Sequence, residues 1–247
     1  MNSYFNVNLE FDRDRINHQI KKKIEAGGKG YVCVVDGNVL AVANKDENYR
    51  SIINKSTLNI CDGSSIAMLA GWIHNKHFSS YTGPDIFNEF ISKNYKQYFL
   101  GNTRENLNRL KNRFVEIGLE LNLFQFEPLP FNSVADFKYK DIANNINEFS
   151  PDIIWVSLGA PKQEKFISYL FPHINKGVLF AIGAAFNLFL GNKENRRAPR
   201  LFRKLHLEWL FRVFQEPNRV GKRAINYLRM VPYLIIEEKK KTKIIRR

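Results

Sequence analysis

The sequence predicts an α/β fold of Rossmann-like architecture, in which a largely parallel sheet carries helices on both faces and a basic helical appendage follows. Three observations predict it: apolar runs alternate with segments of helical periodicity, several apolar runs stop at Gly or Asp, and positive charge gathers near the carboxyl end. The 247 residues are 44% hydrophobic, enough for one sizeable core. We expect that core over residues 1–191 and the appendage over 192–247.

The first element predicted along the chain is a helix. Asp12 and Asp14 lead into the run RINHQIKKKI, so we interpret this Asp-x-Asp pair as a helix cap and not as a site for a metal-bound nucleotide sugar. Strands are then expected at 31–35, 58–61, 98–101, 123–126, 153–158 and 178–183. Helical periodicity is clearest at 66–73, 106–117 and 142–149.

After Gly191 the pattern changes to amphipathic helices. Leu207, Leu210, Phe211 and Phe214 form one apolar stripe at helical spacing. Pro217 and Pro232 are placed where new helices could begin, because proline is tolerated in a first turn and disruptive later. We therefore expect about three short helices.

Charge is unevenly distributed. Residues 196–247 hold 16 Lys and Arg against 4 Glu, which is +12 of the net +14. Such a segment suits nucleic acid, an anionic membrane or an anionic ligand, or merely aids solubility. Because the apolar run 233–236 precedes a lysine cluster, membrane contact is expected beyond Pro232.

The sequence indicates a protein that is cytosolic or peripheral to a membrane. The amino-terminal run MNSYFNVNLEFDRDR lacks the layout of a signal peptide. The longest apolar run, 177–191, is interrupted by Asn187 and falls short of the ~20 residues that cross a bilayer. Cys33 and Cys61 are expected to be buried free thiols, and His74 and His77 to lie on a surface helix.

The segment PDIIWVSLGAPKQEKFI contains the strongest local site signal. A strand-like run stops at Gly159 and is followed by Pro161, Lys162, Gln163 and Glu164. Open α/β sheets bind ligands at the carboxyl ends of their strands. The local pattern fits a ligand-binding turn and an ordinary strand-to-helix turn equally well; in it, Glu164 caps the helix or pairs with Lys162.

Other strands end on comparable groups. Asp62 and Gly63 follow one strand, and Asp62 either faces the ligand crevice or caps the next helix. Asp36 supplies a second carboxylate near the site or simply ends its strand. The Gly101-Asn102-Thr103 turn is either a diphosphate cradle or an ordinary helix cap.

Five blocks resemble, in the same order, the WecG/TagA/CpsF family of glycosyltransferases (glycosyltransferase family 26). Gly83 lies in the second block, and the last two are the most specific: CDGSSIAMLAGW, YTGPDIF, YFLGNTREN, GAPKQE and IGAAFNLFLGNKENRRAPRLFRKLHLEWLFRVFQEPNR. The resemblance implies an inverting, metal-independent transferase without a cofactor. It would move a sugar, such as an N-acetylhexosamine, from a UDP-sugar to a lipid-diphosphate-linked saccharide for surface polysaccharide synthesis. Such an enzyme would be cytoplasmic and peripheral at the inner face of the cell membrane.

The resemblance also suggests residue roles. It makes Asp62 the catalytic base and Gln163 a sugar-recognition group set by the turn at Gly159 and Pro161. It implies that the basic carboxyl-terminal segment closes over the site and engages the membrane, with Arg212, Arg219 and Arg223 as its functional arginines. A homo-oligomer that completes the site is left open.

The sequence departs from the family pattern at several positions. Val34 and Asp36 stand where relatives commonly show Thr-x-Asn, Ser80 lies near a usual arginine, and Asn187 replaces an aspartate. Donor chemistry therefore need not match the family's best-known donor, UDP-N-acetylmannosamine.

Two other functions fit parts of the sequence less well. A nucleic-acid-binding module would use the basic helices with Phe202, Trp209, Phe211 and Tyr227, but no RNA- or DNA-binding signature occurs and no nucleic-acid partner is expected. A nicotinamide-dependent oxidoreductase would need Gly-x-Gly-x-x-Gly after a strand, which is missing.

Overall fold

The computed structural model describes residues 2–191, 199, 202 and 208–245. Its centre is a six-stranded sheet in the order β4-β3-β8-β7-β5-β6, with every neighbouring pair parallel. The strands are β3 (Lys29–Val35), β4 (Leu58–Cys61), β5 (Gln97–Gly101), β6 (Phe124–Glu127), β7 (Ile153–Ser157) and β8 (Gly177–Ala181). All six predicted strands are confirmed, although Leu123 lies in the short helix η1 (Leu121–Leu123).

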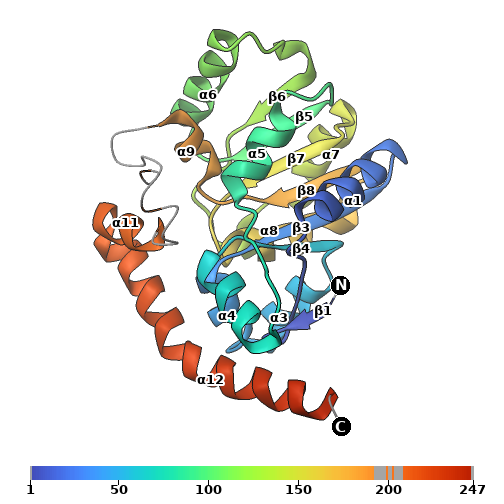
Figure 1. Cartoon of the computed structure of the whole chain (residues 1–247). Helices are drawn as coiled ribbons and strands as arrows, with labels where there is room; N and C mark the ends of the chain where they lie inside the picture. Colours follow the sequence, from blue (N-terminus) through green and yellow to red (C-terminus); the bar gives the residue numbers. More distant parts are fainter. Residues whose placement is uncertain (1, 192–198, 200–201, 203–207, 246–247) are drawn as a thin grey trace.

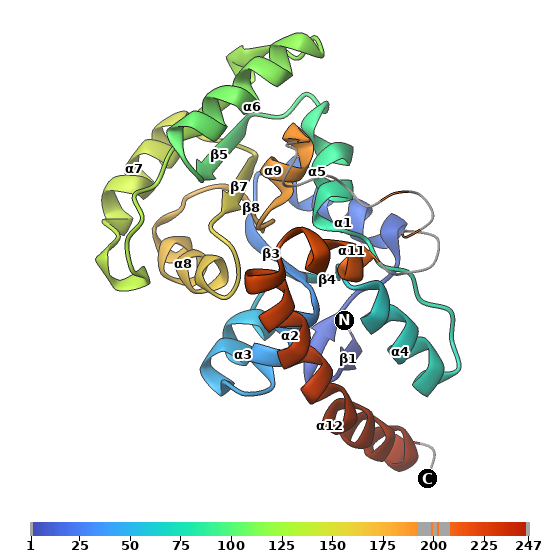
Figure 2. The same ribbon diagram turned by 90° about the vertical axis from the view of Figure 1, so that its left-hand side faces the viewer.

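Helices cover both faces of this sheet, as predicted (Figures 1 and 2). One face is covered by α1 (Arg13–Glu25), α5 (Gly83–Ile91), α6 (Arg104–Glu116) and α9 (Ala185–Leu190). The other is covered by α2 (Gly37–Ala43), α3 (Glu47–Asn54), α4 (Ser64–His74), α7 (Tyr139–Phe149) and α8 (Lys162–Leu170). Two apolar cores result, so central strands are apolar on both sides.

Several smaller predictions are confirmed by local contacts. The Asp12 side chain caps α1 by accepting from the backbone nitrogens of Asp14 and Arg15. Cys33 and Cys61 are buried free thiols. Two further short helices, η2 (Val134–Asp136) and η3 (Phe171–His173), lie in the connections around α7 and β8.

An amino-terminal hairpin was not predicted. Strands β1 (Asn2–Tyr4) and β2 (Val7–Leu9) pair antiparallel through Phe5 and Asn6, whose φ values are 54° and 65°. A left-handed conformation is unusual for a bulky residue. Phe5 adopts it because its ring is buried in the core and its backbone N–H meets a carboxylate from the far end of the chain.

The carboxyl-terminal helices differ from the prediction. The described part holds α11 (Glu208–Gln215), a π-helical segment η5 (Pro217–Gly221) and one long helix, α12 (Lys222–Ile245), so the expected series of short helices is wrong. A helical segment does begin at Pro217, but Pro232 lies inside α12. Packing on both sides of the proline, at Tyr227 and Leu234, stabilises the helix through it.

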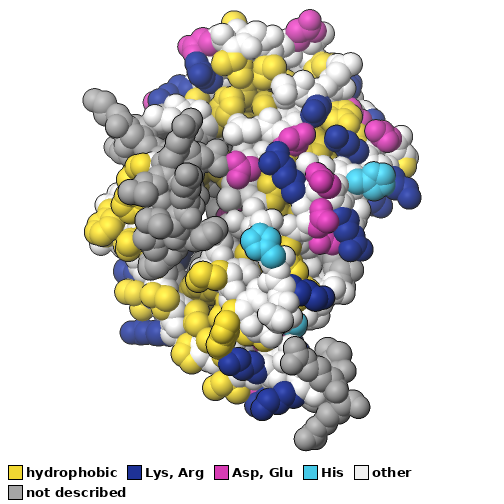
Figure 3. Space-filling model, viewed as in Figure 1, with side chains coloured by type: hydrophobic (Ala, Val, Ile, Leu, Met, Phe, Trp, Pro, Cys, Tyr) yellow, Lys and Arg dark blue, Asp and Glu magenta, His cyan; other side chains and the backbone are white. Residues whose placement is uncertain are grey.

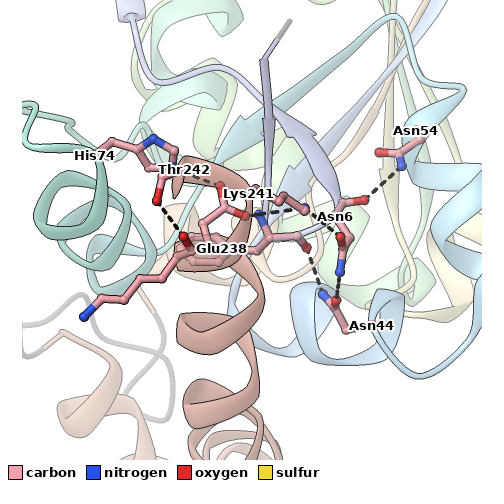
Figure 4. Close-up of polar contacts among 9 residues, drawn as sticks. Asn6, Asn44, Asn54, His74, Glu238, Lys241 and Thr242 are labelled. Atoms are coloured by element: carbon pink, nitrogen blue, oxygen red, sulfur yellow. Dashed lines mark hydrogen bonds and ion pairs between the residues drawn. The ribbon is translucent and has the colours of Figure 1, made fainter. Parts of the chain in front are cut away.

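The second half of α12 is joined to the body by a buried carboxylate (Figure 4). Glu238 is 1% exposed and accepts hydrogen bonds from the backbone nitrogen of Phe5 at 2.8 Å and from His74 Nε2 at 2.9 Å. Lys241 links the same region to Asn6 at 2.7 Å. His74 is therefore a partner of α12 and not simply a surface residue.

The division of the chain into a core (1–191) and an appendage (192–247) stays a prediction.

Candidate functional site

Most predicted site residues lie at the carboxyl ends of the strands of the central sheet. Asp36, Asp62, Asn102 and Gly159 follow the carboxyl ends of β3, β4, β5 and β7, and Gly183 follows β8. Because these strands are parallel and adjacent, their ends form one rim. From β5 the chain continues outward to β6, whereas from β7 it continues the other way to β8. Such a divergence opens a ligand crevice in α/β sheets.

Asp62 is fixed at this rim by the start of α5. Its Oδ1 accepts from the Gly83 nitrogen at 2.9 Å, and the Asp62 nitrogen donates to the carbonyl of Val35 at 3.0 Å. The N-cap residue of α4 is Gly63 and not Asp62. The carboxylate is partly exposed and thus placed at the solvent side of the rim.

Asp36 occupies the neighbouring position on β3. Its Oδ1 accepts from the Val39 nitrogen at 2.8 Å, so it caps α2 while remaining partly exposed. Beside it, a Cβ added at Gly37 would lie 2.8 Å from the ring of Tyr227 in α12. Gly37 is therefore needed for the close approach of α12 to the rim.

Tyr227 is a rim residue that sequence reasoning missed. It is 9% exposed, its hydroxyl lies 3.5 Å from Ser65 Oγ, and burial raises its pKa. The nucleic-acid alternative needs this ring at the surface, where it is not. Its spacing from Arg223, one helical turn away, is the signal that could have indicated a shared face.

The turn after β5 is held by neighbouring protein groups. The Asn102 amide donates to Asn187 Oδ1 at 3.1 Å and its oxygen accepts from the Thr103 nitrogen at 2.8 Å. Thr103 caps α6 through the Asn106 nitrogen. At Gly101, φ is +92° and an added Cβ would lie 2.9 Å from the carbonyl of Ser157. The helix cap is thus present, and the diphosphate cradle stays a prediction.

The turn after β7 has an open side. Gly159 has φ +79°, and no atom lies within 4 Å of where its Cβ would be. The Ala160–Pro161 bond is cis, and α8 begins directly after it. Lys162 extends over the rings of Phe131 and Phe137, at 5.0 and 5.3 Å from the ring centres. A ligand can therefore approach the backbone at Gly159 closely.

Gln163 and Glu164 point inward from α8. Gln163 is 3% exposed; its Oε1 accepts from Gly159 N at 3.1 Å and Gly183 N at 2.9 Å, and its Nε2 donates to Glu164 Oε1 at 2.8 Å. The observed amide contacts are thus with the protein, and direct sugar recognition by Gln163 stays a prediction. The expectation that Glu164 pairs with Lys162 is wrong, because Glu164 is fully buried and accepts from the Tyr49 hydroxyl at 2.9 Å. Its carboxylate also accepts from its own backbone N–H in the first turn of α8.

Of the three predicted arginines, Arg223 has a described side chain. Its Nη2 donates to the carbonyl of Ala160 at 3.2 Å, which joins α12 to the turn after β7. The side chains of Arg212 and Arg219 lie outside the described residues. Among the side chains that the structure describes, Arg223 thus brings a cationic group of the appendage to the rim.

Other features of the described residues lie elsewhere. A hollow on the outer surface is lined by residues of α1 and α5, namely Arg13, Asp14, Asn17, His18, Lys21 and Glu89, and not by the strand ends. Within residues 2–191 and 208–245, no three His, Cys, Asp or Glu side chains form a metal-binding group. No helix in the same ranges has the length and apolar character needed to span a membrane.

A family model and curated relatives both match this chain over most of its length. The family model described as glycosyl transferase WecG/TagA/CpsF family matches residues 3–244. A Bacillus subtilis (strain 168) protein named N-acetylglucosaminyldiphosphoundecaprenol N-acetyl-beta-D-mannosaminyltransferase is 30% identical over 96% of this chain and 90% of its own length. A Staphylococcus aureus (strain MW2) protein of the same name is 24% identical over 86% of this chain and 82% of its own length.

Proposed function

Because the chain belongs to the WecG/TagA/CpsF family and is a glycosyltransferase, we propose that it moves an N-acetylhexosamine from a UDP-sugar to a lipid-diphosphate-linked saccharide, with inversion at the anomeric carbon. The observation that carries the proposal is the position of Asp62. Its carboxylate stands at the carboxyl end of β4, oriented by the Gly83 nitrogen at 2.9 Å.

The reaction assigns this carboxylate one task. The acceptor hydroxyl oxygen attacks the anomeric carbon and forms the new glycosidic bond, while the bond from that carbon to UDP breaks and its electron pair leaves with the diphosphate. Asp62 takes the hydroxyl proton. The Gly83 N–H is the donor in the contact that holds the Asp62 carboxylate, so the carboxylate does not need a proton of its own to keep this position.

The leaving diphosphate needs positive groups and backbone donors. The turn after β7 supports this role, because the open side at Gly159 admits a ligand and Arg223 lies at Ala160. The turn at Gly101 and Asn102 borders the same crevice from β5. We infer that the diphosphate lies between these turns, and the functional roles of Arg212 and Arg219 stay predictions.

We propose the class of the donor sugar, an N-acetylhexosamine, and not one particular sugar. The relatives' names specify an N-acetylmannosaminyl group and a diphosphoundecaprenol acceptor. This chain carries Val34, Asp36, Ser80 and Asn187 at the positions that depart from the family pattern. Asn187 is bonded to Asn102 at the crevice, so the substitution lies where it can affect donor choice.

The lipid acceptor implies a membrane surface, and α4 and α12 present a matching one (Figure 3). Hydrophobic side chains gather there beside Lys and Arg. At helical spacing along α12, Ile225, Leu228 and Ile236 are 50%, 51% and 55% exposed, and on α4 Met68 and Trp72 are 63% and 61% exposed. An apolar stripe with adjacent cations suits an anionic membrane interface.

Lys239 joins the two helices at this surface, since its Nζ lies 3.9 Å from the centre of the Trp72 ring. The membrane surface defined by Met68, Trp72, Ile225, Leu228 and Ile236 therefore includes α4 as well as the basic tail. We propose that it holds the protein at the inner face of the cell membrane. A homo-oligomer and independence from metal stay predictions.

A transfer assay tests the proposed function. The full chain is incubated with several UDP-N-acetylhexosamines and a short-chain lipid-diphosphate N-acetylglucosamine, and UDP release and the product lipid are measured. Asp62→Asn keeps an acceptor for the Gly83 N–H but cannot take a proton, so we expect a loss of about 10²- to 10⁴-fold in kcat. Asp46→Asn, which replaces the cap of α3, is the matched control. Wild-type turnover by Asp62→Asn would contradict the assignment.

A further inference from the structure

One side-chain oxygen joins two turns of the crevice. Gln163 Oε1 accepts from the nitrogens of both Gly159 and Gly183, which follow the neighbouring strands β7 and β8. Both glycines have positive φ, +79° and +55°. The spacing of these two turns at the rim is therefore set by the orientation of a single amide.

That orientation depends on Glu164. If the amide of Gln163 turned over, its NH₂ group would face two backbone N–H donors. The NH₂ group instead donates to Glu164 Oε1 at 2.8 Å, and the Tyr49 hydroxyl donates to Oε2 at 2.9 Å. An ionised carboxylate accepts on both oxygens, which suits both donors.

We propose that Glu164 is a positioning residue: its ionised carboxylate keeps the Gln163 amide in the orientation that ties the turns at Gly159 and Gly183, and so shapes the donor crevice. The inference rests on the proposed function for its consequence in catalysis. Its structural part, the order of the two turns, is independent of any substrate.

The surroundings of Glu164 make this contact sensitive to pH. Besides Gln163 on its own helix, it faces Tyr49 from α3, Cys33 in β3 and Asp36 before α2. Burial raises the pKa of Glu164 to about 7, against the opposing effect of the hydrogen bonds from Gln163, from its own backbone N–H and from Tyr49, and Asp36 raises it further. Burial also raises the pKa of both Tyr49 and Cys33, which keeps them neutral.

Protonation of Glu164 would disturb the hydrogen bonds that Gln163 and Tyr49 donate to it. An O–H on Oε1 would face the Gln163 NH₂ group, and an O–H on Oε2 would face the Tyr49 hydroxyl, which then has to redirect its own proton. Either change weakens the contact that holds the amide. The kcat/KM for the sugar donor should thus fall as the pH drops through the pKa of Glu164.

Two variants separate this role from a general effect on folding. Glu164→Gln removes the titration, so the fall in kcat/KM for the donor near pH 7 should disappear. Tyr49→Phe removes a donor that lowers the pKa of Glu164, so the fall should move to higher pH. Glu47→Gln, an exposed change on α3, should leave the profile as in the wild type.

A third variant tests the link itself. Glu164→Ala removes the acceptor for Gln163, and we expect kcat/KM to fall by about 10- to 100-fold, as misplaced groups at a reaction site do. Hydrogen exchange of peptides containing Gly159 and Gly183 should be faster in Glu164→Ala than in Glu47→Gln, without any substrate present.

The outcomes are distinguishable from those of the proposed function. If the wild type transfers sugar but Glu164→Gln and Tyr49→Phe keep its pH profile, or if exchange at the two glycines is unchanged in a folded Glu164→Ala, the positioning role is overturned. If the wild type transfers no sugar from any donor, the proposed function fails while the exchange measurement still decides whether Glu164 orders the turns.

Discussion

Arg223 in α12 donates a hydrogen bond from Nη2 to the carbonyl oxygen of Ala160, at 3.2 Å. The contact joins the carboxyl-terminal helix to the turn that follows β7. The rim of the sheet and the basic appendage therefore meet at this turn. Substitutions in α12 should consequently alter the rate of catalysis as well as membrane binding.

Arg223→Ala should lower kcat/KM by about 10- to 100-fold while changing the free energy of unfolding by only ~1 kcal/mol, because one partly exposed hydrogen bond contributes little to stability. Initial rates and denaturant unfolding measure the two effects. Arg229→Ala removes an equal charge from an exposed position on the same helix and should keep wild-type rates with a soluble acceptor. Equal losses in both variants would contradict a local role.

Glu238→Ala should destabilise the protein by about 3–5 kcal/mol, because it leaves the Phe5 N–H and the His74 ring without their buried acceptor. For a chain of this size that corresponds to a fall in Tm of roughly 6–20 °C. Glu237→Ala is the neighbouring control, since its pair with Lys240 is exposed, and it should cost under about 1 kcal/mol. Matching losses would show that Glu238 does not join α12 to the body.

The pH dependence of stability should reveal Glu164. Its pKa is about 7 in the folded protein, above the 4.5 of an exposed glutamate, so between these values the folded state binds the proton more tightly. The resulting stabilisation is present below pH 4.5 and is lost as the pH rises through 7. The difference in free energy of unfolding between wild type and Glu164→Gln should therefore fall over this range. A constant difference would contradict the raised pKa.

Membrane binding should depend on α4 and on α12. Trp72→Ser and Ile236→Ser each remove an exposed apolar side chain from the membrane surface, and each should weaken sedimentation with anionic phosphatidylglycerol vesicles. High salt should weaken it further, because exposed charges are screened. Val115→Ser changes an apolar residue of α6 that is 58% exposed and serves as the control. Unchanged binding by both surface variants would remove α4 and α12 from the interface.

Much of the fold could be predicted because each central strand is apolar on both sides and ends at a polar or glycine turn. The hairpin could not, since the left-handed Phe5 is stabilised by Glu238, more than two hundred residues away. Pro232 misled for a related reason: local chemistry disfavours a proline within a helix, but packing at Tyr227 and Leu234 outweighs that preference.

The candidate site divides in the same way. The sequence by itself determined which groups end the strands, so Asp36, Asp62, Asn102 and Gly159 could be named in advance, because parallel strands bring their carboxyl ends to one edge. Only the tertiary structure decided which way α8 turns its polar side chains. The sequence made Gln163 a sugar-recognition group and Glu164 a helix cap or a partner of Lys162, but α8 packs with both side chains inward. Buried polar groups need hydrogen-bond partners, and these two find them within the protein.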